Sequence, residues 1–268
     1  MNDVFLSEIY IYPIKSLGGI SLESSEISLR GLKHDRRYML IDENRNFVTQ
    51  REFSSLALIK VNIDGENLVC SINNNIIKFP LLPKTNNFID VKVWRSNCKA
   101  ELFENNINDW FSDYLNENVK LVYMPETTER AVNPLFSINN DIVSFADGYP
   151  YLIASQSSLD DLNSKLEKKI NMDRFRPNLV IRGLEPFIED KIKELRIGNI
   201  KFFLVKPCER CVITTIDQDT GINNGKEPLK TLSTYKRKDN KVTFGQNSIS
   251  EQKNGTLNIG DKIGFIKT

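Results

Sequence analysis

The sequence contains few of the residues that mark several large classes of protein. It has four cysteines and one histidine among its 268 residues. Four unevenly spaced cysteines are too few for the disulfide framework of a secreted domain. A single histidine rules out a histidine-rich metal site. We therefore expect reduced thiols and a cytoplasmic protein.

An excess of charge of one sign and long apolar stretches are also lacking. The 36 basic and 35 acidic residues leave a formal net charge of +1, whereas a nucleic-acid binder normally has a marked basic excess. Apolar runs such as 202–205 are far shorter than the ~20 residues that span a bilayer. No leader with a basic and then an apolar part stands at the N-terminus. We expect no nucleic-acid partner and no membrane span.

Glycine-rich phosphate loops are missing as well. Neither Gly-x-Gly-x-x-Gly after a strand nor Gly-x-x-x-x-Gly-Lys-Ser/Thr occurs in the chain. These motifs let backbone amides approach the phosphates of a nucleotide. Nucleotide cofactors held by such loops are therefore not expected.

The patterning indicates a mainly β protein with a few helices. Over the first ~100 residues, short segments rich in β-branched and aromatic residues alternate with turns such as 42–46 and 64–66. This spacing predicts an antiparallel sheet or barrel. Apolar residues at helical spacing predict helices over 107–115, from about 157, and over 229–235.

A polar stretch with mixed proline, glycine and charge runs from about 124 to 148. Such composition is typical of a segment between domains. We place a domain boundary there, which predicts an N-terminal domain over 1–123 and a C-terminal domain over 124–268. The second domain is also predicted to be mainly β, with strands that include 201–205 and 212–216.

Cys208-Glu-Arg-Cys211 is the most informative tetrapeptide. A redox pair of the thioredoxin type begins a helix, but the β-branched run 212–216 favours a strand. Structural zinc and iron–sulfur sites need more cysteines nearby. A loop between strands usually displays functional groups, and Arg210 beside Cys211 would favour a thiolate. These features favour a single reactive thiolate, as metal ligand or nucleophile, over a buried inert pair.

Basic residues beside turns form a second candidate set. Lys15 and Ser16, Arg36 and Arg176 combine a cation with a hydroxyl group or a rigid turn. Phosphates and other oxyanions need such donors, and arginine binds them in bidentate fashion. The alternative for each residue is a solvated surface charge. His34, which stands among charged residues, is interpreted as a solvated turn residue.

Several segments resemble a known family. Tyr12-Pro-Ile-Lys-Ser16 and Gly31–Tyr38 resemble the N-terminal β-barrel that precedes MOSC (molybdenum cofactor sulfurase C-terminal) domains. Phe175–Asn178, Lys206–Thr215 and Phe244–Asn247 resemble the MOSC domain itself. The resemblance implies a β-barrel N-terminal domain plus a MOSC β-barrel domain. It is greatest to the mitochondrial amidoxime-reducing component and its bacterial counterparts, which reduce N-hydroxylated compounds.

The resemblance also assigns roles to individual residues. Cys211 would be the thiolate ligand to molybdenum, and Asp217 would be a catalytic group near the metal. The remaining residues, which would contact the molybdenum cofactor (Mo-molybdopterin), are Lys15, Ser16, Arg36, Arg176, Asn178 and Thr214. The protein would hold and tune the cofactor, while the metal carries out the redox chemistry.

The implied activity is a molybdenum-cofactor-dependent reduction of small N-hydroxylated molecules such as amidoximes and hydroxylamines. No Cys-x4-Cys-x2-Cys run is present, so electrons are expected from a separate ferredoxin-like, flavin reductase or cytochrome b5-like protein. The mitochondrial relatives carry a targeting and membrane segment ahead of the barrel. Here the first predicted strand begins almost at Met1, which favours a soluble cytoplasmic form.

Two other functions remain open. Cys211 could carry a persulfide for sulfur transfer, or the protein could bind the cofactor without turnover. Fused cofactor sulfurases, which link this family to pyridoxal phosphate, carry a large pyridoxal-phosphate domain. At 268 residues, this chain is too short to hold one.

Overall fold

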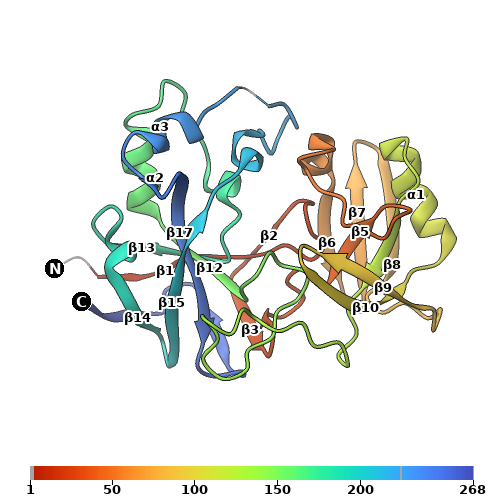
Figure 1. Cartoon of the computed structure of the whole chain (residues 1–268), viewed down its shortest axis with the longest axis horizontal. Coiled ribbons are helices and arrows are strands. Elements are labelled where there is room, and N and C mark those ends of the chain that lie inside the picture. Colours follow the sequence, from red (N-terminus) through yellow and green to blue (C-terminus); the bar gives the residue numbers. More distant parts are fainter. Residues whose placement is uncertain (1–2, 224, 268) are drawn as a thin grey trace.

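The computed structural model describes residues 3–223 and 225–267, and strands make up most of its regular structure (Figure 1). The prediction of a mainly β protein with a few helices is confirmed. The helical elements in this part of the chain are α1 (Asn105–Leu115), α2 (Gln156–Asn163), α3 (Leu229–Ser233) and the 3-10 turns η1 (Ser54–Leu58), η2 (Met172–Phe175), η3 (Ile188–Lys191) and η4 (Val212–Thr215). The three helices lie close to their predicted positions.

One nine-stranded sheet forms the left lobe in Figure 1. Its strands are β1 (Phe5–Ile11), β2 (Ile20–Leu22), β12 (Tyr151–Ser155), β13 (Leu179–Arg182), β14 (Ile192–Ile197), β15 (Ile200–Glu209), β16 (Arg237–Lys238), β17 (Lys241–Ser250) and β19 (Ile263–Lys267). Their order is β19, β14, β15, β17, β12, β13, β1, β2, with β16 paired to β17. β12 and β13 run parallel and the other pairs run antiparallel.

The described residues also form three smaller sheets. They are β5 (Tyr38–Ile41), β11 (Lys120–Tyr123), β10 (Ser96–Leu102) and β9 (Phe88–Val93); β18 (Thr256–Asn258), β3 (Ser24–Ser28) and β4 (Gly31–Leu32); and β6 (Lys60–Asp64), β7 (Asn67–Ile72) and β8 (Asn75–Pro80). The division at residue 124 stays a prediction, and strand pairing crosses it. β1 pairs with β13, and β3 pairs with β18.

Aromatic side chains fill the interior of both lobes. In the right lobe the rings of Tyr38 and Phe103 lie 6.0 Å apart, and Phe111 of α1 is fully buried. In the left lobe the rings of Phe175 and Phe244 stack, with 3.9 Å between centroids and 18° between planes. Such ring pairs contribute about 0.5–1.5 kcal/mol beyond the area they bury. Because Phe175 directly precedes Arg176, core packing also fixes a predicted site residue.

The predicted strand over 212–216 is wrong, because this segment forms the 3-10 turn η4. The Thr214 hydroxyl donates to the carbonyl of Cys211 at 3.0 Å, and the Thr215 hydroxyl donates to the carbonyl of Val212 at 2.7 Å. Such local bonds engage backbone acceptors that a strand would present to its neighbours. The hydroxyl groups of the two threonines therefore decide the conformation of this segment more than its β-branched composition does.

Glu189 in η3 is a fully buried carboxyl group. The Ser158 hydroxyl donates to its Oε1 at 2.6 Å, while its Oε2 has no hydrogen-bond partner. Burial raises the pKa of Glu189 from its ordinary value of 4.5 to about 7. The folded protein therefore holds a proton that the unfolded chain releases above pH 4.5. The stability contributed by this group is complete below that pH and is lost as the pH rises through 7.

We expect Glu189→Gln, which cannot ionise, to remove this dependence. Relative to the variant, the wild-type protein should lose as much as about 3 kcal/mol of unfolding free energy between about pH 5 and about pH 8. Denaturant unfolding at both pH values measures the difference, with the exposed Glu185→Gln as control. A gap between wild type and Glu189→Gln that is equal at both pH values would contradict the assignment.

Candidate functional site

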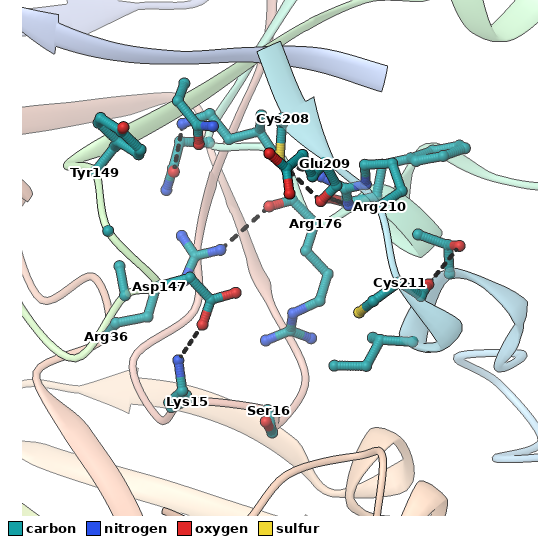
Figure 2. A pocket seen from close by; sticks show the side chains of 18 of the residues that line it. Lys15, Ser16, Arg36, Asp147, Tyr149, Arg176, Cys208, Glu209, Arg210 and Cys211 are labelled. Carbon is teal, nitrogen blue, oxygen red and sulfur yellow. Dashed lines mark hydrogen bonds and ion pairs between the residues drawn. The ribbon is translucent and has the colours of Figure 1, made fainter. Parts of the chain in front are cut away.

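A cavity where the two lobes meet collects residues from both halves of the chain (Figure 2). Seven of the eight residues predicted from the sequence line it, namely Lys15, Ser16, Arg36, Arg176, Asn178, Cys211 and Thr214. Strand pairing brings these segments together. The Tyr10 amide donates to the carbonyl of Asn178, and the Lys15 amide donates to that of Tyr38, both at 2.8 Å.

The ring of Tyr12 positions two arginines. The guanidinium carbons of Arg36 and Arg176 each lie 4.2 Å from its centroid, a geometry worth about 0.5–2 kcal/mol. The buried carboxylate of Asp35 accepts from Arg36 Nη1 and from the Tyr12 amide, both at 2.8 Å. Arg36 Nη2 donates to the carbonyl of Arg176 at 3.1 Å. We call Tyr12, Asp35, Arg36 and Arg176 the tyrosine–arginine cluster.

Three lining residues have a left-handed backbone although none is glycine. Their φ angles are 72° at Ser16, 49° at Arg36 and 51° at Arg176. A residue with a Cβ atom pays roughly 1–3 kcal/mol for such a conformation, which persists only where the surroundings enforce it. Non-glycine residues of this kind concentrate at binding and catalytic sites. Ten other non-glycine residues in the described part of the chain have the same conformation outside this lining, so the left-handed backbone accompanies the cavity without marking it.

The guanidinium group of Arg176 is incompletely satisfied. Its Nη2 atom is buried and has no hydrogen-bond partner. Burial lowers the pKa of Arg176 to about 10, so the group is still charged at neutral pH. In Figure 2 this guanidinium lies in the open space between Ser16 and Cys211. A cation whose buried donor has no partner suits an anionic ligand.

Lys15 already has a carboxylate partner inside the protein. Its Nζ donates to Asp147 Oδ1 at 2.6 Å and to the carbonyl of Phe145 at 2.9 Å. Trp94 Nε1 donates to the same Asp147 oxygen at 3.1 Å. Burial lowers the pKa of Lys15, and the charge of Asp147 offsets part of that shift. An anion bound at Lys15 would compete with the exposed carboxylate of Asp147.

The two thiols of the Cys-x-x-Cys pair have different cationic neighbours. Arg51 Nη2 donates to the sulfur of Cys211 at 3.3 Å, and Arg210 Nη1 donates to that of Cys208 at 2.8 Å. The expectation that Arg210 favours a thiolate at Cys211 is therefore wrong, because Arg210 reaches back to Cys208. In Figure 2 the sulfur of Cys211 points toward the guanidinium group of Arg176.

The charges of the lining favour an anion. Five lining side chains are cationic and two are anionic, which leaves an excess of three positive charges: Lys15, Arg36, Arg51, Arg176 and Arg210 against Asp147 and Glu209. Within residues 3–223 and 225–267, no group of three or more His, Cys, Asp or Glu residues could hold a metal ion.

Two family models and several curated proteins match most of the chain. Residues 4–118 match the family described as the MOSC N-terminal beta barrel domain, and residues 140–264 match the MOSC domain. The chain is 32% identical to mitochondrial amidoxime-reducing component 1 from Mus musculus and from Homo sapiens, over 97% of this chain and 82% of each relative. Identity to component 2 from Rattus norvegicus is 34%, over 96% of this chain and 82% of the relative. The chain belongs to the MOSC-domain family.

Asp217 is the predicted site residue that does not line the cavity of this MOSC-domain protein. Its carboxylate pairs with Arg174 Nη2 at 2.8 Å and accepts from the backbone amides of Asp219 and Thr220. Burial opposes ionisation of Asp217, but these hydrogen bonds and Arg174 hold its pKa below the ordinary value. The geometry makes Asp217 part of the turn that follows η4, and its role near a metal stays a prediction.

Asn178 and Thr214 line the cavity of the MOSC-domain protein but also bind its backbone. Asn178 Oδ1 accepts from the Leu152 amide at 3.1 Å, and its Nδ2 donates to the carbonyl of Tyr10 at 3.1 Å. The Thr214 hydroxyl is engaged by the carbonyl of Cys211. Both side chains therefore hold neighbouring segments in place around the cavity.

Three residues that shape this site are not among those predicted from the sequence. Arg51 contacts Cys211 and lies 5.0 Å from the Trp94 ring centroid. Asp147 and Arg130 come from the polar stretch that was interpreted only as a domain boundary. The sequence held a signal in Asp147-Gly148, a dipeptide that is typical of a turn, directly after the apolar Phe145 and Ala146. The partners of these charges lie far away in the sequence, so their pairing could not be foreseen.

None of the helices in the described part of this MOSC-domain protein has the length and apolar character that crossing a membrane requires. The relatives named above are called mitochondrial. The cytoplasmic location therefore stays a prediction.

Arg130 supports the segment that carries Asp147. It is buried, and its guanidinium group donates to the carbonyls of Ser144, Ala146 and Asp147 at 2.6–3.0 Å. We expect Arg130→Ala to lower the free energy of unfolding by about 2–4 kcal/mol, because several charge-assisted bonds to buried carbonyls are lost. Denaturant unfolding measures this, with the exposed neighbour Glu129→Ala as control. Equal stability of the two variants would show that the segment holds itself in place.

Proposed function

We propose that this protein is a molybdenum-cofactor-dependent oxidoreductase that reduces small N-hydroxylated compounds, including amidoximes and hydroxylamines, with electrons from a separate redox protein. The observation that carries the proposal is the unpartnered, buried Nη2 atom of Arg176 in the same cavity as the Cys211 sulfur. The names of the relatives point to the same reaction class.

The lining residues fit a cofactor that carries a phosphate and a dithiolene-bound metal. The excess of positive charge suits the phosphate, and Cys211 offers a soft ligand of the kind that sulfur-bound metals prefer. The cavity encloses about 140 Å³ and opens to solvent, so a cofactor the size of a pterin phosphate would extend through its mouth. Asp147 and Asp35, which now pair with Lys15 and Arg36, would share those cations with the phosphate.

Each lining residue then has a definite task. Arg176 would bind the pterin through its spare donor, and Lys15, Ser16 and Arg36 would bind the phosphate. Asn178 and Thr214 would keep the neighbouring backbone in place. Once bound through Cys211, the cofactor would supply two-electron chemistry in which the N–O bond of the substrate is reduced with uptake of two protons and release of water. The Arg51 guanidinium beside Cys211 would stabilise negative charge on that sulfur.

The site also constrains the electron donor and the substrate. Cys211 is half-buried and the cavity opens to solvent, so a small molecule can approach the Cys211 sulfur. A ferredoxin-like, flavin reductase or cytochrome b5-like protein would supply the electrons. For Asp217 we propose a supporting role, because its bond to Arg174 holds the turn next to Cys211.

The paired substitutions Cys211→Ala and Cys208→Ala test the metal ligand. We expect Cys211→Ala to remove molybdenum and reductase activity while the protein stays folded, because a methyl group cannot coordinate a metal. Cys208→Ala should keep both. Metal analysis by mass spectrometry, on protein from cells that make the cofactor, measures occupancy. Equal loss in both variants would refute the single-ligand assignment. Absence of molybdenum together with a persulfide on Cys211 would favour sulfur transfer instead.

Arg176 and Arg174 offer a matched pair of substitutions only two residues apart. Arg176 has an unpartnered donor, whereas the buried Arg174 forms an ion pair with the half-buried Asp217. We expect Arg176→Ala to lower cofactor occupancy at least about tenfold, because it removes a charge-assisted hydrogen bond worth about 1.4 kcal/mol or more. The thermal stability of the cofactor-free protein should change little. Arg174→Ala should mainly destabilise the cofactor-free protein. The reverse pattern would show that Arg176 is structural.

A further inference from the structure

A second cavity, of about 750 Å³, lies away from the first and shares no lining residue with it. It forms where the turn between β3 and β4, the segment leading into β5, and the residues after β8 meet. Its volume falls within the range of about 300–1,000 Å³ that is typical of small-molecule sites. The proposed reaction at the first cavity gives this space no role.

One part of this second cavity is apolar. Leu29 and Leu82 line it with more than half of their surface exposed, and Leu81 lies beside them. The buried rings of Tyr38 and Tyr123, whose centroids are 5.4 Å apart, belong to the same lining. Exposed leucines next to aromatic rings leave apolar surface in contact with water, and burying it against a ligand would release free energy.

The charged part of the lining has an excess of cations. Arg30, Lys33, Arg37 and Lys84 stand against Glu66 and Glu126. Glu126 bridges two of the cations, with 2.7 Å to Arg30 and 2.6 Å to Arg37. Lys33 pairs with Glu26 outside the cavity. Lys84 is exposed and has no ion pair among the described residues, so it can meet a ligand directly.

His34 also lines the second cavity, close to the charges of Lys33 and Arg37. Burial lowers its pKa, and the charges of Lys33 and Arg37 lower it further, while Glu26 opposes them. The imidazole is therefore neutral at pH 7 and adds no charge of its own. An anionic group placed among Lys33, Arg37 and Lys84 would meet a favourable field.

We propose that the second cavity binds a small amphipathic anion, with an apolar body against Leu81, Leu82 and the tyrosine rings and an acid group directed to Lys84. The two surface types line one cavity, and within it Leu29, Leu82 and Lys84 are exposed. Aliphatic or aromatic carboxylates and sulfonates have this chemistry. The proposal does not rest on the proposed function, because no residue is shared between the two cavities.

Binding of two probes, 8-anilinonaphthalene-1-sulfonate by its fluorescence and monomeric dodecanoate by competition, tests this proposal on the full chain. We expect Lys84→Glu to weaken both at least about tenfold, because an attraction becomes a repulsion at short range. The matched control Lys92→Glu, on an exposed lysine of β9 that does not line the cavity, should leave binding unchanged. Glu126→Gln should strengthen binding, since it removes a negative charge from the lining.

Opposite effects of Lys84→Glu and Glu126→Gln, in variants with unchanged far-ultraviolet circular dichroism, would establish the site. Equal weakening by Lys84→Glu and Lys92→Glu would mean that only the net charge matters, which would overturn the proposal. Loss of probe binding in Arg176→Ala would place the probes in the first cavity and would also overturn it. Binding of the protein to vesicles of anionic lipid, without binding of monomeric dodecanoate, would overturn the proposal as well. Molybdenum content and reductase activity should not change in Lys84→Glu, so failure here leaves the proposed function untouched.

Discussion

The buried carboxylate of Asp35 is the contact on which the site depends. It accepts from the Tyr12 amide and from Arg36, and so joins the segment after β1 to the segment before β5. The Tyr12 ring then brings Arg36 and Arg176 together. Removing Asp35 would leave two guanidinium groups close to one ring with no counter-charge at this point, a costly arrangement in a poorly hydrated interior.

Around this cluster the two lobes contribute different components. The nine-stranded sheet supplies Arg176 and Cys211, which are held by the stacked Phe175 and Phe244 rings and by the end of β15. The other lobe supplies Arg51, which reaches the Cys211 sulfur. The cavity exists only because strands distant in the sequence pair with each other. The left-handed backbone at Ser16, Arg36 and Arg176 is locally unfavourable, and the pairing of distant segments holds it in place.

Part of this architecture could be predicted because it depends on local pattern. Apolar periodicity located α1, and turn residues between β-branched segments indicated a mainly β fold. The same reasoning failed at 212–216, where threonine hydroxyls bonded to nearby carbonyls and produced η4 in place of a strand. It also paired Arg210 with the wrong cysteine, because adjacency in sequence does not say on which side of an extended chain a side chain lies.

The sequence by itself determined the fold class and the family, because both depend on residue types at short spacing along the chain. Seven of the eight site residues that it predicted line one cavity. Only the tertiary structure decided which cations are already neutralised, as with Lys15 by Asp147, and which retains a spare donor, as with Arg176. It also decided that Asp217 serves Arg174 and that a second cavity lies beside β8. Charge pairing and cavities depend on contacts between distant segments, and strand pairing together with side-chain packing sets those contacts.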